Sequence, residues 1–497
     1  MRNFSKSKLL ALRQCPKRLW LEIHRPDLRE DSAATQVSFQ VGHHVGDIAR
    51  RIYDPDGRGA FIDVAIEGFS GAFARSKELL QTSHPIFEAG FSAGGALAFA
   101  DVMLPEQVGG KQVWHMVEVK ATTSVKDYHR DDAAIQAYIA HTAGVPLQSI
   151  ALAHIDNTWV YPGGDDYRGL LKKNDLTDEA FSRTEEVKEW IANAALTAVS
   201  SAQPAIETGA HCNTPYACGF IGYCNQDKPQ SEFPVNWLPR IGSKAVAFAE
   251  QGVIDLRDVP DDQLNVKQRR VKAHTLANTT YFDAEGAAAL LAQYSLPAYF
   301  LDFESIQFAV PIWKGTRPYQ QNVFQFSLHS LAATGELDQS AFLDLSGNDP
   351  SEPCAKALIQ SCGTDGPIYV YSAFESTRIR ELAARFPQSS AALLAIVARL
   401  VDLLPIAREH YYHPSQQGGW SLKLVLPAVV PELRYDALDG VQDGGMAMDA
   451  YLEAIHPDTS IERKNQIEQQ LLSYCKLDTY ATVRLWQVFA GRTDLKL

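Results

Sequence analysis

The run from His115 to Thr122 reads HMVEVKAT and places an acid and a base two positions apart in an otherwise apolar stretch. In a β-strand, residues two apart point to the same face of the sheet. Glu118 and Lys120 would therefore face one point. Two interpretations are open: a surface strand with a salt bridge, or a metal site with a catalytic lysine. The surrounding sequence favours the second.

A second carboxylate lies in the apolar segment that precedes this strand. Asp101 stands in ALAFADVML, Glu88 lies on the segment before that, and the pair Gly94–Gly95 between the two segments predicts a hairpin turn. The next strand would then bring Glu118 beside Asp101. Two carboxylates there would bind a divalent ion through oxygen ligands, as Mg²⁺ prefers, and Mn²⁺ is an equivalent choice. Such an ion activates a water molecule and stabilises charge on a phosphate.

The remaining polar groups of this set fit phosphodiester chemistry. Lys120 would place its ammonium near the attacking water or near the charge that develops on the phosphate. Gln136 lies in RDDAAIQAYIAHTAG, a predicted helix over residues 130–144. From that helix its amide could orient the lysine or a nucleic-acid backbone.

The order of hairpin, E-x-K strand and glutamine-bearing helix resembles the RecB-like branch of the PD-(D/E)XK nucleases. This resemblance implies a restriction-endonuclease-like fold, metal ligation by Asp101 and Glu118, and catalytic roles for Lys120 and Gln136. Two features depart from that family. Its helical G-x-x-x-H histidine has no counterpart, because Gly46 stands there and His43 and His44 are wrongly spaced. Its tyrosine four residues after the glutamine is replaced by alanine.

Three cysteines follow in HCNTPYACGFIGYC, residues 211–224, at intervals of six, and a distant fourth is Cys15. Cys15, Cys212, Cys218 and Cys224 could complete a tetrahedral Zn²⁺ site or hold a 4Fe–4S cluster, and the spacing decides for neither. One cysteine before the nuclease core and three after it resembles the iron–sulfur members of the RecB-like nucleases. That resemblance implies a 4Fe–4S cluster that staples the first helix to the end of the domain, with Zn²⁺ as the alternative. The other cysteines are expected to be buried thiols: Cys354, Cys362 and Cys475.

A second set of acids begins in YFLDFES, where Asp302 and Glu304 are again two apart on an apolar strand. Two acids on one face repel each other unless a cation lies between them. Glu375 follows at a predicted strand-to-helix junction, and Tyr474 and Asp478 lie four apart on a late helix, hence on one helix face. Four acids could bind two ions for in-line attack on a phosphodiester, and the tyrosine hydroxyl would orient the attacking water.

In this order the acids and the tyrosine resemble the DEDDy 3′–5′ exonucleases of the RNase H-like fold, over about residues 296–490. The resemblance implies that Asp302, Glu304, Glu375 and Asp478 are metal ligands. The sequence departs from that pattern at two positions. Glu375 stands where aspartate is usual, and Ser372 stands near where asparagine is common.

Basic and aromatic residues supply candidate contacts to nucleic acid. The loop HYYHPSQQGGWSLKLVLP, residues 410–427, could stack a single strand, or could be packed with Trp420 in the core. Candidate phosphate contacts are Arg13, Lys17, Arg18, Arg269, Arg270 and Lys272; each could equally be part of a solvated helix face.

Composition sets the outer limits. The chain has 497 residues, 46% of them hydrophobic and 21% charged, with seven cysteines and a net charge of −13. The charge argues against a basic coat for non-specific duplex binding but allows carboxylate-bound metal ions. No run of about 18 apolar residues suggests a membrane span. The first residues lack a signal-peptide pattern, and we expect a cytoplasmic protein without a disulfide framework.

We therefore expect an α/β chain in three parts. Residues 1–229 form the PD-(D/E)XK domain with the cysteine cluster, 230–292 a helical connector, and 293–497 the RNase H-like exonuclease domain. Residues 5–24 are expected to form one amphipathic helix. The predicted function is metal-dependent cleavage of DNA, most simply of single strands or ends, in repair or defence against foreign DNA. Two alternatives stay open: a nucleic-acid-binding protein with one or both sites inactive, and an RNA-directed nuclease.

Overall fold

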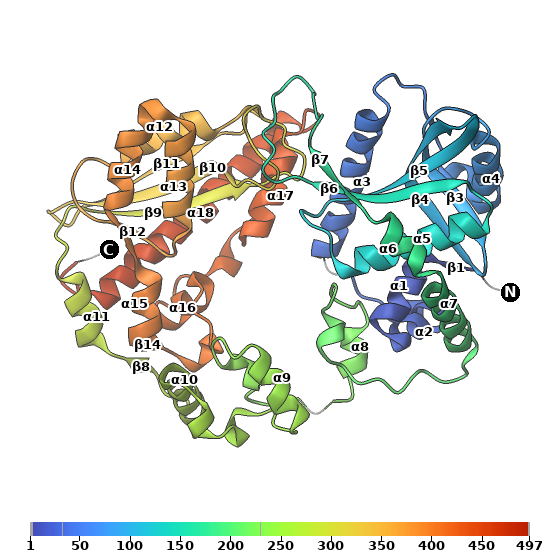
Figure 1. Ribbon diagram of the computed structural model, residues 1–497. Coiled ribbons are helices and arrows are strands. Elements are labelled where there is room, and N and C mark those ends of the chain that lie inside the picture. Colours follow the sequence, from blue (N-terminus) through green and yellow to red (C-terminus); the bar gives the residue numbers. More distant parts are fainter. Residues whose placement is uncertain (1–2, 32, 229, 496–497) are drawn as a thin grey trace. The chain divides into compact units, whose positions relative to one another are not determined.

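The computed structural model describes residues 3–31, 33–228 and 230–495, and it has the mixed α/β character expected (Figure 1). The chain forms two compact units. Unit 1 comprises Met1–Pro229 together with Phe308–Tyr319, and unit 2 comprises Gln230–Gln307 and Gln320–Leu497. Within the described residues, no helix is both long enough and apolar enough to cross a membrane.

Unit 1 is built on one sheet with the strand order β2-β3-β4-β5-β6-β7. The short strand β1 also belongs to this sheet and pairs in parallel with β4, outside that order. The turn Gly94–Gly95, with both residues at positive φ, closes the expected hairpin of β3 and β4. The strands are β1 (Phe4–Ser5), β2 (Ala60–Phe61), β3 (Ile86–Ala93), β4 (Ala96–Val108), β5 (Lys111–Lys120), β6 (Leu147–Ile155) and β7 (Leu171–Asp175).

The helices of unit 1 cover both faces of this sheet. Trp114 and Met116 of β5 are buried in the same cluster as the alanines of α5, whereas Val117 points to the opposite face. Glu118 and Lys120 continue the series of Trp114 and Met116 and thus face α5. The helices are α1 (Lys6–Gln14), α2 (Pro16–His24), α3 (Ala33–Tyr53), α4 (Val64–Leu79), α5 (Asp127–Thr142), α6 (Thr177–Ser182), α7 (Thr184–Val199) and α8 (Ile221–Asn225).

The single helix expected over residues 5–24 is wrong: the structure has two helices, α1 and α2, that meet at Cys15. Cys15 is extended, with φ −164° and ψ 119°. The reason is Pro16, whose ring disfavours helical geometry in the residue before it.

The helical segment after residue 230 packs with unit 2 rather than standing alone. It contains α9 (Ser243–Glu250), α10 (Val266–Ala277), β8 (Tyr281–Phe282) and α11 (Ala284–Leu291). Strand β8 pairs with β14 (Tyr411–Tyr412). Gly418, at φ +77°, lies so close to the segment that a Cβ there would come within 1.5 Å of the Trp237 carbonyl oxygen.

Unit 2 has a five-stranded sheet in the order β11-β10-β9-β12-β13. Strands β9, β10 and β11 are antiparallel neighbours, and β12 and β13 run parallel to β9. The strands are β9 (Ala298–Ile306), β10 (Asn322–Leu331), β11 (Leu337–Leu343), β12 (Ile368–Val370) and β13 (Leu400–Asp402).

The two faces of this sheet are covered by different helices. Leu301 and Phe303 are buried with α12, α13 and α14, while Phe300 packs edge-on against Trp486 of α18. Asp302 and Glu304 alternate with Leu301 and Phe303, so they face α18. The helices are α12 (Ser351–Ser361), α13 (Phe374–Arg385), α14 (Ser390–Ala398), α15 (Leu403–His410), α16 (Leu422–Val429), α17 (Gly444–Ile455) and α18 (Ile461–Phe489).

Candidate active sites

In unit 2, three of the predicted acids converge. Ligand oxygens of Asp302, Glu304 and Asp478 all lie within 4.8 Å of one another. Among the residues that the structure describes, this is the only group of three or more His, Cys, Asp or Glu side chains so arranged. Two of the acids come from β9 and the third from α18. The group is therefore able to hold one metal ion through oxygen ligands.

Aromatic and basic side chains surround these carboxylates. Tyr435 donates its hydroxyl to Asp478 Oδ1 at 2.6 Å. Lys423 Nζ lies 5.2 Å from the ring centre of Tyr435 and 5.1 Å from that of Tyr474. Tyr474 is buried one helical turn before Asp478, as its spacing predicts. Tyr435 was missed by the sequence reasoning, because it lies in a short 3₁₀ segment with no periodic pattern.

Burial raises the pKa of each of these carboxyls, and repulsion from neighbouring carboxylates adds to the rise for Asp302 and Glu304. The pKa of Glu304 rises to about 8 through burial and the nearby charge of Asp478. The pKa of Asp478 rises to about 6 through burial, against the hydrogen bond from Tyr435. Asp302 has a pKa well above its ordinary value, because it is buried and faces Asp478 and Glu375. A carboxyl with a raised pKa ionises more readily when a cation lies beside it, so all three acids would gain from a metal ion.

Glu375 stands outside the group of three. It lies in the first turn of α13 and is buried, and it accepts a 3.4 Å hydrogen bond from the Ser372 hydroxyl. Burial raises its pKa to about 7, with a further contribution from Asp402. Its charge acts on Asp302, so the two are neighbours. The structure thus unites three of the four predicted acids around one point and places the fourth beside them.

In unit 1, Glu118 is the centre of a charged cluster. Its Oε1 accepts hydrogen bonds from Lys120 Nζ at 2.5 Å and from Lys6 Nζ at 2.7 Å. Its Oε2 accepts a hydrogen bond from the Gln136 amide at 2.6 Å. The predicted trio of Glu118, Lys120 and Gln136 is therefore brought together. Lys6, at the start of α1, was missed, because nothing in its neighbourhood distinguishes it from a solvated lysine.

Asp132 is a further member that the sequence reasoning missed. It contacts Lys120 Nζ at 2.8 Å and Lys6 Nζ at 3.5 Å, and it accepts a 3.0 Å hydrogen bond from Gln136. Burial would raise the pKa of Asp132, but the two lysines hold it below its usual range. The signal was available: Asp132 lies four positions before Gln136, on the same face of α5.

Asp101 lies beside this cluster on β4. The β4–β5 register pairs Val102 with Val117, so Asp101 stands one step further, opposite Glu118. Its Oδ2 accepts the Val119 backbone N–H at 2.6 Å, and burial together with the charge of Glu118 raises its pKa well above the ordinary value. Glu88 on β3 adopts a left-handed φ of 58°, which is strained for a residue with a Cβ.

All four predicted cysteine ligands line one pocket in unit 1, together with Lys17 and Arg18. Cys15 comes from the α1–α2 break, Cys212 and Cys218 from the loop after α7, and Cys224 from α8. The three other cysteines are buried free thiols, as expected.

Most of the other basic residues predicted to contact phosphate already bind groups of the protein itself. Arg269 donates to the Leu264 carbonyl at 2.8 Å, and Lys272 binds the Val259 carbonyl at 2.6 Å and Asp261 at 2.7 Å. Trp420 is buried and donates its indole N–H to the Tyr411 carbonyl. The loop that contains it is therefore packed, the second of its two interpretations.

Comparison with known families adds one match. Residues 299–421 match the model of a family described as a domain of unknown function (DUF2779). The matched segment contains Asp302, Glu304 and Glu375 and ends before Tyr474 and Asp478. A comparison with curated proteins finds no match.

The raised pKa of Glu304 predicts a pH-dependent stabilisation by the change Glu304→Gln in metal-free protein. The native state holds the Glu304 proton more tightly than the unfolded state, so wild-type stability falls as pH rises from the ordinary value of 4.5 through about 8. Glutamine cannot ionise. We expect no gain below this range and a gain on the order of 3 kcal/mol above it.

Thermal unfolding with a chelator, measured across this pH range, checks the prediction. Glu468→Gln changes an exposed acid on α18 and is the matched control. A gain for Glu304→Gln that is the same at acid and alkaline pH would contradict it.

Proposed function

We propose that this chain is a metal-dependent nuclease with one candidate active site in each unit, acting on single strands or ends of DNA. The observation that carries the proposal is the convergence of Asp302, Glu304 and Asp478 at one buried point. Three carboxylates with raised pKa values are expensive to bury without a function, and divalent cations are their natural partners.

In unit 2, Asp302, Glu304 and Asp478 would hold the ion, which when bound supplies Lewis-acid polarisation of a phosphate and an activated water. Tyr474, one turn from Asp478, is in place to orient that water through its hydroxyl. Tyr435 fixes Asp478 by its 2.6 Å hydrogen bond. A sheet whose first three strands are antiparallel, with the next two parallel to the first, is compatible with the RNase H-like DEDDy exonuclease that the sequence resembles.

In unit 1, Asp101 and Glu118 on neighbouring strands are the residues that would hold Mg²⁺ or Mn²⁺. Lys120, already 2.5 Å from Glu118, would present its ammonium to the attacking water or to the phosphate. Gln136 holds Glu118 and Asp132 through its amide, so it fixes the orientation of both acids. These contacts support the RecB-like PD-(D/E)XK assignment.

The pocket of four cysteines could hold a 4Fe–4S cluster, which the resemblance to the iron–sulfur RecB-like nucleases favours, with Zn²⁺ as the alternative. Zn²⁺ would also accept four thiolates, and the shared pocket supplies four sulfurs for either group. A cluster would link the α1–α2 break to the loop after α7. Its role would be structural, because it would hold together segments about 200 residues apart in the chain.

A second candidate function is nucleic-acid binding with one or both sites inactive. Two observations favour it. Glu118 is satisfied by two lysines and a glutamine, and Glu375 stands outside the group of three acids. Cleavage assays decide between the two functions, and they include RNA substrates because an RNase H-like site suits either polymer.

Two separable activities are predicted. Asp302→Ala removes a metal ligand in unit 2, and Lys120→Ala removes the ammonium in unit 1, so each should lower a different cleavage activity about a hundredfold or more. Tyr474→Phe should reduce the unit 2 activity without abolishing it. The measurement is Mn²⁺- or Mg²⁺-dependent cleavage of end-labelled single- and double-stranded DNA and RNA.

Lys356→Ala alters an exposed lysine of α12 and serves as the control for purification and folding. Wild-type cleavage by the double variant Asp302→Ala, Lys120→Ala would overturn the nuclease function. If wild-type protein binds these oligonucleotides but cleaves none of them, the binding function is established instead.

The cysteine pocket makes a prediction of its own. Protein purified without oxygen should be brown and contain about four irons per chain, as a 4Fe–4S site requires. Cys212→Ser should lose the colour and destabilise unit 1. Cys354→Ser, which changes a buried thiol in unit 2, should retain the colour even if it lowers stability. One zinc per chain without iron would establish the Zn²⁺ alternative.

A further inference from the structure

Unit 1 contains a second, larger cavity that neither metal site uses. It measures about 660 Å³ and opens between α1, the start of α5 and the cysteine-bearing loop. Its lining includes Arg13, Lys126, Tyr128, His211 and Tyr216. This volume lies within the range of small-molecule binding sites, which is about 300–1,000 Å³.

Two tyrosines give the cavity an aromatic lining. The rings of Tyr128 and Tyr216 meet edge to face, with centroids 6.0 Å apart and an angle of 87°. Tyr216 is 40% exposed, although Arg18 lies 5.1 Å from its ring centre. The backbone around Tyr216 is fixed, because Gln14 donates its amide to the Tyr216 and His211 carbonyls at 2.8 Å each.

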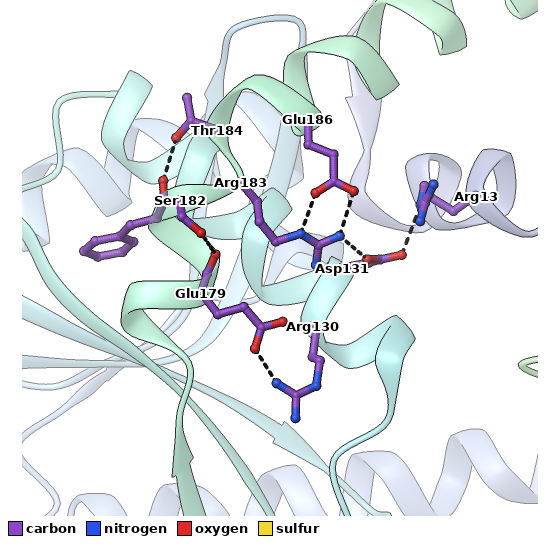
Figure 2. A network of polar contacts seen from close by, with 9 residues as sticks. Arg13, Arg130, Asp131, Glu179, Ser182, Arg183, Thr184 and Glu186 are labelled. Carbon is purple, nitrogen blue, oxygen red and sulfur yellow. Dashed lines mark hydrogen bonds and ion pairs between the residues drawn. The ribbon is translucent and has the colours of Figure 1, made fainter.

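One wall is held by a network of charges that joins α1, α5 and the start of α7. Figure 2 shows Asp131 between two arginines, Arg13 at 3.1 Å and Arg183 at 2.7 Å. Arg183 also binds Glu186 through two hydrogen bonds of 2.6 and 3.0 Å. The guanidinium of Arg13 lies 4.4 Å from the ring centre of Trp190. The charges in this wall are already paired, so the wall presents a fixed shape rather than a strong anion site.

The cavity lies between the Glu118–Lys120 cluster and the cysteine pocket. Gln14 and His211 line both the cavity and the cysteine pocket. On the other side, Tyr128 is close enough to Lys120 for that charge to act on its hydroxyl. The cavity is therefore close to the position where Lys120 would act on a nucleic-acid strand.

We propose that this cavity binds one unstacked nucleobase of a single nucleic-acid strand, held against Tyr128 and Tyr216. The inference deepens the proposed nuclease function and rests on it, since the bound base belongs to the strand presented to Lys120. The rings of Tyr128 and Tyr216 suit a flat ring, and base–aromatic stacking tolerates any sequence. A base within a duplex is held in its stack, so the cavity selects single strands or frayed ends.

Lys126 extends the site toward the nucleic-acid backbone. It is exposed, it lines the cavity, and it makes no ion pair with any residue that the structure describes. Its ammonium is therefore available to a phosphate next to the bound base. The resulting contact depends on salt, whereas the stacking contact does not.

The test uses the full-length protein in chelator, so that binding is measured without cleavage. The probe is a single-stranded DNA oligonucleotide with 2-aminopurine at one position, and the readouts are anisotropy of an end label and quenching of the base. Tyr128→Ala and Tyr216→Ala should each weaken binding about tenfold and reduce quenching. The corresponding phenylalanine variants should bind like wild type.

Two further variants control for folding. Ala210→Trp fills the cavity without removing any wall and should also lose quenching. Phe69→Ala removes an exposed aromatic ring elsewhere in unit 1 and should change neither readout. Free adenosine or dAMP that competes as strongly as the oligonucleotide would overturn the strand assignment in favour of a small-nucleotide site.

The outcomes separate this inference from the proposed function. Loss of quenching in the tyrosine and Ala210→Trp variants would establish the base site even if no variant ever cleaved. Undiminished binding and quenching in all three would overturn the base site, while Lys120-dependent cleavage would leave the nuclease function standing.

Discussion

The structure depends on one electrostatic constraint: carboxylates that are buried side by side must be neutralised. Ligand oxygens of Asp302, Glu304 and Asp478 lie within 4.8 Å of one another, and Glu304 and Asp478 are buried. Coulomb repulsion grows as the local dielectric falls, so the charged forms of all three are disfavoured. The fold nevertheless holds them there, because β9 is fixed in the middle of its sheet and α18 packs along it.

The two units meet this constraint in different ways. Unit 1 carries its own cations: Lys6 and Lys120 neutralise Glu118 and Asp132. Unit 2 has Lys423 near its aromatic rings but no ion pair to its three acids among the described residues, and protons or a metal ion must fill that role. The two lysines of unit 1 offset Glu118 and Asp132, whereas the acids of unit 2 have no such partner among the described residues and gain most from an ion. This difference makes unit 2 the stronger candidate for a resident divalent cation.

Local sequence patterns predict much of the arrangement of the candidate site residues. The alternation in HMVEVKAT and YFLDFES placed the paired charges on one face, and a four-residue spacing placed Tyr474 and Asp478 on one helix face. The Gly94–Gly95 turn predicted the β3–β4 hairpin, and the pairing of β4 with β5 sets Asp101 opposite Glu118. The α/β class is confirmed, while the specific nuclease folds stay predictions.

Contacts between residues far apart in the chain could not be predicted from the sequence. Lys6 reaches Glu118 across 112 residues, and Tyr435 reaches Asp478 from a segment without periodicity. No local propensity encodes such contacts, because they follow from the packing of whole elements. The packing of residues 230–292 with unit 2 was missed for the same reason: it depends on β8 pairing with β14 and on the close approach of Gly418 to Trp237.

The central claim is that a divalent ion replaces protons on the acids of unit 2. Calorimetric titration of Mn²⁺ into metal-free protein near pH 7, in two buffers with different ionisation enthalpies, tests it most directly. Since burial raises the pKa of Glu304 to about 8 and that of Asp302 well above its ordinary value, binding should release about one proton per ion. The heats should then differ between buffers, and the difference should vanish in Asp302→Asn, Asp478→Asn. Equal heats in both buffers, or unchanged binding in that variant, would contradict the account.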